Sequence, residues 1–403
     1  MSDFSQNGII STLHDFGTKP TSIIEKELLE FSKQRKMELI LPCLYSELDG
    51  SALPKIVDEI SKTKYLDHVI IGLDRANEKQ AKSAWKFFKK IKTPFTILWN
   101  DGRSEAQCKR IEASEPHSRA ITGNIAMPGF TAPKLVWLEE NEPDNFAKVA
   151  KVLLPKDYLR FLMSGDFASD MSDSAGTLWL DVENRQWSKA MLAATNLSED
   201  QMPTLFEGTQ ITGRLKPELA KKWGMQAVPI IAGGGDNAAG AAGIGVINPN
   251  EAFLSLGTSG VYFVANESYR PNPDSAVHTF CHCIDNTWHQ MSVILSAASC
   301  LSWVTKLTGY QDEESLLVEV EKLDFSRPST VTFLPYLSGE RTPHNNPNAQ
   351  GVFFGLGHNT DSAELGRAVL EGIAFAFADG QQALIAAGTK IDRVSVIGGG
   401  SVS

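Results

Sequence analysis

The residues best suited to carry chemistry lie between positions 232 and 260. A single carboxylate, Asp236, follows a run of glycines, and further along a Leu-Gly-Thr-Ser-Gly segment places Gly257, Thr258 and Ser259 in a tight turn. Glycines let the backbone approach a ligand closely, and successive N–H groups in such a turn form a nest for phosphate oxygens. A carboxylate beside a phosphate cradle is what transfer of a phosphoryl group to a hydroxyl requires. Each motif alone is also compatible with an ordinary turn of an α/β protein.

Composition sets broad limits on the class of protein. A chain of 403 residues is long enough for two or three domains, and its net charge of -10 argues against nucleic acid or an anionic membrane surface as the main partner. It holds no apolar run of membrane-spanning length, and its polar start is not a signal peptide. The five sparse cysteines fit a reducing compartment, so we expect a cytoplasmic protein.

One cysteine cluster, Cys281-His282-Cys283, raises the question of a metal site. A Cys-x-Cys pair without a second ligand pair at usable spacing is a weak metal motif. We therefore assign no metal ligand and expect a half-buried strand there.

The first part of the chain alternates between strand and helix patterns. Apolar runs predict strands over 37–44, 68–74 and 93–99, with helices over 52–63 and 77–91 between them. Such a run forms half of a doubly wound sheet, whose ligands bind at the carboxyl ends of the strands. The apolar face of the first of these helices is expected to consist of Leu53, Ile56, Val57 and Ile60.

Asp74 stands at the carboxyl end of the second predicted strand. In that place a carboxylate could accept hydrogen bonds from a nucleotide base or ribose. It could equally cap the helix that follows. The sequence is compatible with both roles, ligand binding and helix capping.

The later part of the chain contains one strongly marked helix. Asp361 and Glu364 form a capping-box pair, apolar residues recur at helical spacing after them, and Gly388 supplies the stop. A strand over 393–397 then leads into a run of glycines. Upstream, residues 153–181 combine a short helix with a Ser/Asp-rich loop that could hold a polyhydroxylated ligand or be an ordinary turn.

Residues 97–403 resemble the FGGY family of carbohydrate kinases, and within it the bacterial xylulokinase type. The two signature segments of that family match residues 129–141 and 351–372. Further segments match in the same order along the chain: 153–160, 170–181, 233–240, 256–260 and 333–347.

The resemblance implies an α/β, actin-like fold, in which two domains of ribonuclease-H type close over a cleft for Mg-ATP and a sugar. It implies ATP-dependent phosphorylation of D-xylulose to D-xylulose 5-phosphate, with ATP and Mg²⁺ as cofactors. Asp236 matches the general base that takes the proton of the 5-hydroxyl, and Asn237 matches a position that contacts the sugar. The positions that match the ATP-binding loops are Gly257, Thr258, Ser259, Gly399 and Gly400.

The first 96 residues do not fit that family. Segments 4–14, 41–48 and 69–74 instead resemble the start of a GT-A glycosyltransferase of the glucosyl-phosphoglycerate synthase type. That resemblance implies half of a Rossmann-like sheet that binds nucleotide sugars in its family. The Asp-x-Asp metal motif and acceptor site of those enzymes are not found here.

A Leu-Trp-Asn-Asp-Gly segment at 98–102 fits both families, and the change of identity falls there. We therefore predict a chimera of three parts: a GT-A-like fragment over 1–96, the remainder of a kinase N-terminal domain over 97–244, and a kinase C-terminal domain over 245–403. The last part is expected to be truncated, because the family has a helix after the position of Gly400.

The leading hypothesis is a xylulokinase-type kinase that is impaired in this chain, because the family's first phosphate loop, Asp-x-Gly-Thr, does not occur before Ile97. Its partners would be the sugar and ATP, and nothing in the sequence indicates an oligomeric state. One alternative is a nucleotide-sugar-dependent glycosyltransferase with an altered C-terminus. Another is a non-catalytic fusion product.

Overall fold

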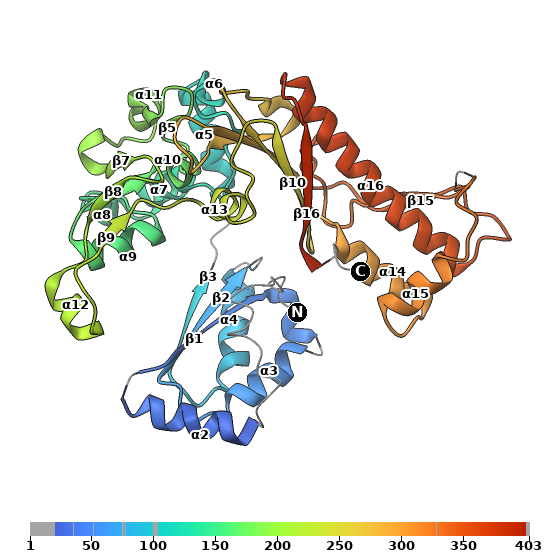
Figure 1. The fold of residues 1–403 in the computed structure, drawn as a ribbon, viewed down its shortest axis with the longest axis horizontal. Coiled ribbons are helices and arrows are strands. Elements are labelled where there is room, and N and C mark those ends of the chain that lie inside the picture. Colours follow the sequence, from blue (N-terminus) through green and yellow to red (C-terminus); the bar gives the residue numbers. More distant parts are fainter. Residues whose placement is uncertain are drawn as a thin grey trace. The chain divides into compact units, whose positions relative to one another are not determined.

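The computed structural model describes residues 21–34, 36–50, 52–74, 76, 78–99, 104–327 and 329–399. Its contacts divide the chain into two compact units, Gln6–Ala106 and a larger one that takes in Gln107–Ser403 (Figure 1). In these described ranges no helix combines the length and apolar character needed to cross a bilayer.

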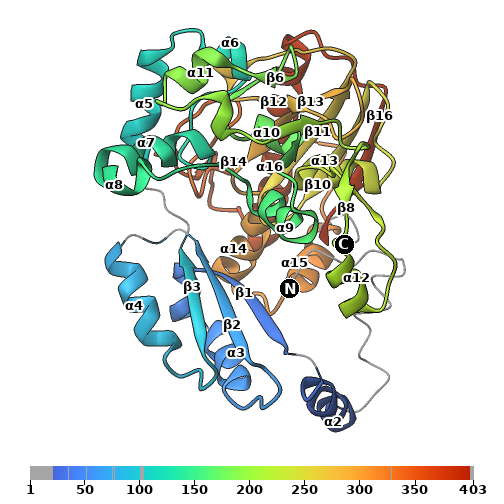
Figure 2. The ribbon, with the colours of Figure 1, turned by 90° about the vertical axis from the view of Figure 1, so that its left-hand side faces the viewer.

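The smaller unit contains a parallel three-stranded sheet in the order β1-β2-β3, with β2 in the centre (Figure 2). Apolar strands joined by helical crossovers favour this parallel arrangement. The strand–helix alternation predicted from the sequence is confirmed. The elements are α2 (Thr21–Ser32), β1 (Glu38–Leu44), the short 3-10 helix η1 (Tyr45–Asp49), α3 (Ala52–Ile60), β2 (His68–Asp74), α4 (Glu78–Phe88) and β3 (Phe95–Trp99).

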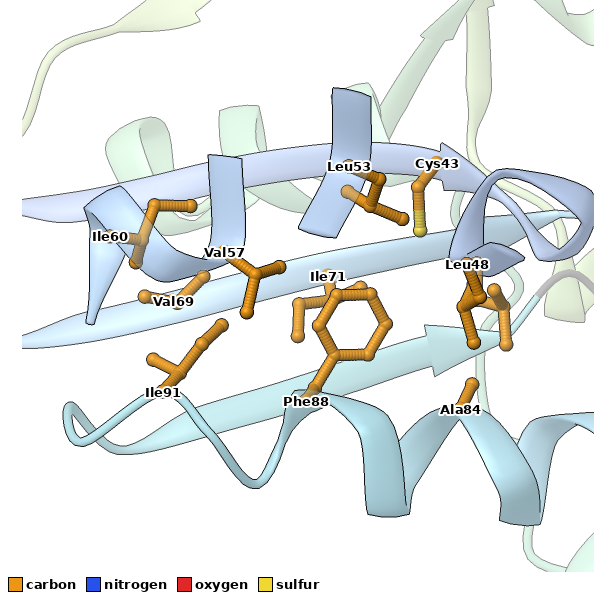
Figure 3. Packing of buried hydrophobic residues seen from close by; sticks show 11 residues of the cluster. Cys43, Leu48, Leu53, Val57, Ile60, Val69, Ile71, Ala84, Phe88 and Ile91 are labelled. Atoms are coloured by element: carbon orange, nitrogen blue, oxygen red, sulfur yellow. The ribbon is translucent and has the colours of Figure 1, made fainter. Parts of the chain in front are cut away.

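The hydrophobic core of the smaller unit lies between the sheet and the helices α3 and α4. Val57 of α3 and Phe88 of α4 are fully buried and point toward Ile71 on β2 (Figure 3). The predicted apolar face of α3 is wrong at one position, because Ile56 is 45% exposed. Leu53, Val57 and Ile60 form the stripe that meets the sheet, and Ile56 lies at its edge.

The first part of the larger unit, up to the glycine-rich segment, is mainly helical. Its core surrounds Trp179, which is fully buried and donates a hydrogen bond from Nε1 to Thr195 Oγ1 over 2.9 Å. The helices are α5 (Glu105–Ser114), α6 (Ser118–Thr122), α7 (Thr131–Asn141), α8 (Pro143–Phe146), α9 (Pro155–Ser164), α10 (Met171–Ala175), α11 (Lys189–Ala193), η2 (Glu199–Gln201), α12 (Pro217–Trp223) and α13 (Asp236–Gly243). The strands pair two by two: β4 (Ala168–Asp170) with β7 (Thr204–Phe206), β5 (Leu180–Asp181) with β6 (Gln186–Trp187), and β8 (Ile211–Arg214) with β9 (Pro229–Ile231).

The second part is organised around a five-stranded sheet in the order β12-β13-β11-β10-β16. The first four strands pair antiparallel, and β16 is parallel to β10. The elements are β10 (Glu251–Leu256), β11 (Gly260–Asn266), η3 (Pro273–Ser275), β12 (His278–Cys281), β13 (Trp288–Ile294), α14 (Ala298–Thr308), α15 (Glu313–Val320), β14 (Thr332–Leu334), β15 (Val352–Phe354), α16 (Ser362–Ala386) and β16 (Arg393–Ile397).

Helices cover both faces of this sheet. Along β11, Tyr262 packs with the buried side of α16, whereas the next residue, Phe263, packs with Ala241 of α13. This alternation follows from the two-residue period of a strand. The helix that carries Asp236 therefore lies on one face of the sheet, and α16 lies on the other.

The long helix predicted near the end of the chain is confirmed as α16, the red helix of Figure 1. Asp361 caps it by accepting a hydrogen bond from Glu364 N over 2.9 Å, and the Glu364 side chain bonds back to Asp361 N. Gly388, with φ of +85°, follows the end of the helix. A capping box at one end and a glycine near the other fix the length of the helix.

Candidate active site

Asp236 is the first residue of α13, and its side chain is exposed. Its Oδ1 atom accepts hydrogen bonds from Asn237 N over 2.7 Å and from Asn237 Nδ2 over 3.1 Å. Within the described part of the chain, nothing donates a hydrogen bond to Oδ2 of Asp236. One carboxylate oxygen is therefore held by Asn237, and the other is available to a hydroxyl group.

Among the three glycines before Asp236, Gly234 is required by close packing, because a Cβ atom there would lie 2.7 Å from Cys283 Cβ. Gly208, from an earlier part of the chain, packs against the same loop, and a Cβ atom on it would lie 2.2 Å from Cys283 O and 2.7 Å from Gly233 O. Gly233 also has φ of +84°, which L side chains rarely adopt. The bend inferred from the sequence is therefore a tightly packed loop.

A buried group of charges lies in the same region, on α9 and around the start of α10. Lys156 Nζ pairs with Asp157 Oδ1 at 2.6 Å and with Asp170 Oδ2 at 2.7 Å, and both carboxylates are completely buried. Arg160 Nη2 pairs with Asp157 Oδ1 at 2.7 Å. Buried charges persist only when they are paired and hydrogen-bonded in this way.

This charge group contacts the glycine-rich loop directly at two points. Arg160 Nη1 donates a hydrogen bond to Ala232 O over 3.1 Å, and Gly235 N donates one to Ser172 Oγ over 2.9 Å. Ser172 Oγ in turn donates to Asp170 Oδ1 over 2.6 Å. The loop that carries Asp236 is thus connected through side chains to the ion pairs of Lys156.

A second carboxylate, Asp173, acts electrostatically on the same site. The pKa of Asp173 is raised to about 6, chiefly by burial; Lys156 opposes this shift, and the carboxylates of Asp170, Asp157 and Asp236 add to it. A Cβ atom on Gly235 would lie 3.6 Å from Asp173 Oδ1, so this carboxyl group is close to the backbone of the loop.

The Gly257–Ser259 turn joins β10 to β11. Its carbonyl groups are bonded to the first turn of α14: Thr258 O accepts from Ala297 N over 2.9 Å, and Gly257 O accepts from Ala298 N over 3.0 Å. The amide N–H groups of Thr258 and Ser259 make no hydrogen bond to any described residue, and both residues are exposed. Free, neighbouring amide groups on a rigid turn are suited to bind phosphate oxygens.

The parallel pairing of β10 and β16 places a second glycine loop beside this turn. Ser255 lies opposite Ile397, so Gly257 and Gly399 follow the ends of adjacent parallel strands. Between them, Gly398 has φ of +95°, and a Cβ atom there would lie 2.7 Å from Leu256 O. Gly400, the other predicted adenosine-loop residue, lies outside the described residues.

Two other sequence expectations concern possible ligand positions. The side chain of Asp74 lies outside the described residues, although its backbone ends β2 as expected. The Cys281–Cys283 segment is more buried than predicted, since Cys281 and His282 are fully buried. Side chains on both sides explain this burial: Cys281 packs with Leu180 and Val182, and His282 meets Phe263 edge-on. The structure, where it describes the chain, contains no group of three or more His, Cys, Asp or Glu side chains placed to hold a metal ion.

Sequence reasoning did not find the charge group beside the loop. Lys156 and Arg160 are four residues apart on α9, a spacing that puts both on one helix face. The sequence indicated a charge group only through this basic pair and through Asp170 and Asp173 in a short Ser/Asp-rich segment. It did not indicate that this group contacts the glycine-rich loop, because Ser172 and Gly235 are separated by 63 positions in the sequence.

Comparison with known proteins identifies the family. Residues 84–243 match the N-terminal domain of the FGGY family of carbohydrate kinases, and residues 252–403 match its C-terminal domain. The chain belongs to the FGGY family of carbohydrate kinases. Among its relatives, the xylulose kinase of Escherichia coli (strain K12) is 59% identical over 307 residues, and that of Klebsiella pneumoniae is 57% identical over 304 residues.

These FGGY relatives are longer than the part that this chain matches. The match covers 76% of this chain and 63% of the Escherichia coli protein, and for Klebsiella pneumoniae the shares are 75% and 63%. A crystal structure of a xyloylose kinase from Brucella ovis is 55% identical, with a TM-score of 0.72 over 76% of this chain and 63% of that one. The likeness supports the α/β, actin-like architecture of this family for the FGGY part of the chain.

Proposed function

We propose that this chain is a sugar kinase of the xylulokinase type, which transfers the γ-phosphoryl group of ATP to the 5-hydroxyl of D-xylulose. The observation that carries the proposal is the Asp236 carboxylate, which has one oxygen fixed by Asn237 and the other without a hydrogen-bond donor among the described residues. The high identity to proteins named xylulose kinase supports the choice of sugar.

In the proposed reaction, Asp236 accepts the proton of the 5-hydroxyl group while the oxygen of that hydroxyl forms the new bond to the γ-phosphorus. The bond between the γ-phosphorus and the bridging oxygen breaks, and ADP leaves with that electron pair. Asn237 fixes the direction of the carboxylate and contacts the sugar. The work of the protein is mainly positioning and proton acceptance, as is general for phosphoryl transfer.

The ATP side of the proposal uses the two glycine loops at the ends of β10 and β16. The free amides of Thr258 and Ser259, next to Gly257, would hold phosphate oxygens. Gly399 and Gly400 would border the adenosine, where missing side chains let the nucleotide lie against the backbone. Mg²⁺ enters as part of the Mg-ATP substrate, and no residue of the chain is assigned to it.

The test is the substitution Asp236→Asn in the full chain, with D-xylulose-dependent release of ADP from ATP as the measurement. Loss of a general base lowers kcat by roughly 10²- to 10⁴-fold, and we expect a decrease in that range. Asp144→Asn, at an exposed aspartate of α8, is the matched control and should leave kcat unchanged. Equal turnover of Asp236→Asn and the unmodified chain would remove Asp236 from the base role.

For the start of the chain we propose a separate origin, as a fragment of a GT-A glycosyltransferase; the sequence placed its end at residue 96, whereas the match to the FGGY N-terminal domain begins at residue 84. Its support is the resemblance of three segments together with the parallel order β1-β2-β3, which suits half of a Rossmann-like sheet. Binding of UDP-glucose or GDP-glucose to the full chain, measured by calorimetry, would support this origin. Binding of ATP without any binding of UDP-glucose or GDP-glucose would argue against it.

We also propose that a polypeptide of these 403 residues turns over more slowly than an intact relative and acts in the cytoplasm. The slower turnover is expected because no Asp-x-Gly-Thr phosphate loop occurs before Ile97. Comparison of kcat with that of the Escherichia coli enzyme under the same conditions tests this proposal, and equal values would contradict it.

A further inference from the structure

Ser172 occupies a distinctive position between a buried charge and the catalytic loop. It lies in the first turn of α10 and is 6% exposed. Its hydroxyl group accepts a hydrogen bond from Gly235 N over 2.9 Å and donates one to Asp170 Oδ1 over 2.6 Å. It is thus the link between the residue before Asp236 and a buried carboxylate.

The surroundings determine the direction of this hydroxyl group. Asp170 Oδ1 also accepts hydrogen bonds from Ser172 N over 2.9 Å and Asp173 N over 3.1 Å, while Oδ2 pairs with Lys156 Nζ at 2.7 Å. A carboxylate can only accept, so the single hydroxyl proton of Ser172 points to Asp170. The lone pairs of the oxygen are then left for Gly235 N–H.

Gly235 is restrained by α13 only on its carbonyl side, where its C=O accepts a hydrogen bond from Ala239 N over 2.9 Å, so its N–H side needs an external partner. It is the residue before the first turn of α13 and has no side chain to cap its own helix. A glycine samples more backbone conformations than any other residue, and a rotation of its peptide unit turns the following residue. That following residue is Asp236.

We propose that Ser172, oriented by Asp170, is a positioning residue that fixes the direction of the Asp236 carboxylate through the Gly235 peptide. This inference rests on the proposed role of Asp236 as the base. Ser172 contacts no substrate in this mechanism. It acts by holding the Gly234–Gly235 peptide, one residue before the base.

The experiment compares two buried serines of the same short helix. Ser172→Ala removes the acceptor for Gly235 N–H, whereas Ser174→Ala removes a hydroxyl whose hydrogen bond, among the residues described, runs to Ser169 Oγ over 2.8 Å and not to the glycine-rich loop. We expect kcat to fall about tenfold for Ser172→Ala, with the KM values for D-xylulose and ATP within about twofold of the original, because small displacements of a reacting group lower the rate. Ser174→Ala should leave kcat unchanged.

A second variant protects the test against misfolding. Ser172→Cys keeps the size of the side chain but replaces the oxygen with sulfur, a weak acceptor. It should show the same fall in kcat with a melting temperature close to that of the unmodified chain. An unchanged kcat for a folded Ser172→Cys protein would overturn the proposal.

A double-mutant cycle separates positioning from a general structural effect. Once Asp236 is replaced by Asn, the direction of that side chain no longer limits proton transfer, so adding Ser172→Ala should not lower the residual rate further. The same tenfold fall in both backgrounds would show a structural role and refute the inference. If Asp236→Asn alone had full activity, the proposed function itself would fail, which is a different result.

Discussion

The loop that carries Asp236 and the turn at Gly257–Ser259 are held in place in opposite ways. The first is fixed by side chains that lead into buried ion pairs, through Ser172 and Arg160. The second is fixed by its own carbonyl groups, which bond to the backbone at the start of α14, while its amide groups meet no acceptor in the described part of the chain. The difference suits the role proposed for each, because a base must point in one direction, whereas a phosphate group is bound by several amides at once.

The largest effect that this comparison predicts is a loss of stability when the buried charge beside the Asp236 loop is removed. Asp170→Asn removes the buried carboxylate from Lys156 and should destabilise the fold by about 3 kcal/mol, near the low end for a broken buried pair, because Lys156 keeps Asp157 at 2.6 Å. Urea unfolding measures this change. A change below about 1 kcal/mol would mean that the ion pair is not what holds the loop.

A smaller effect is expected at the second loop, where the backbone carries the contacts. Gly398→Ala adds a Cβ atom 2.7 Å from Leu256 O at a φ of +95°, and strain of this kind costs about 1–3 kcal/mol. We expect the KM for ATP to rise several-fold, with the KM for D-xylulose unchanged.

Gly240→Ala is the control for this change. Gly240 lies within α13, and a Cβ atom there meets nothing within 4 Å, so alanine should preserve activity and raise stability by up to about 1 kcal/mol. If Gly398→Ala raised the KM for ATP and the KM for D-xylulose equally, the two loops would not be held in place independently.

The smallest effect concerns the charge of Asp173. Its pKa is raised by burial to about 6 from 3.8, so between these pH values the folded chain binds more protons than the unfolded chain. Ionisation of Asp173 therefore lowers the free energy of unfolding as pH rises through this window.

Asp173→Asn removes this dependence. The melting temperature of the variant minus that of the unmodified chain should become more positive as pH rises from 3.8 toward about 6, and then stay constant. Scanning calorimetry over this range is the measurement. A difference that does not vary with pH would mean that Asp173 titrates as it does in the unfolded chain.

Local features of the fold were predictable because their causes are local. The strands of the smaller unit follow from apolar runs, and α16 follows from Asp361, Glu364 and Gly388, which mark its two ends. Ile56 was assigned to the apolar face of α3 and is nevertheless 45% exposed, because a sequence pattern gives the face of a helix but not the width of the surface that covers it.

The candidate site was predictable only in part, for a related reason. A glycine-rich turn can be read from consecutive residues, so Asp236 and the Gly257–Ser259 turn could be proposed directly. Residues 156–173 contact the loop only after the chain has folded, and their polar residues are also common in ordinary helices and turns. The degree of burial of Cys281 and His282 likewise depends on distant packing, against Val182 and Phe263.

The two attachments of α13 have a mechanical consequence. The body of this helix packs on the five-stranded sheet through Ala241, while the loop at its start is tied to α9 and α10. Ala232 and Gly235 are both tied to those helices, whereas Ala241 packs on the sheet, so a shift between the sheet and the helices would be taken up between Gly235 and Ala241. Asp236 lies at the start of that interval, so such a shift would change the direction of the proposed base.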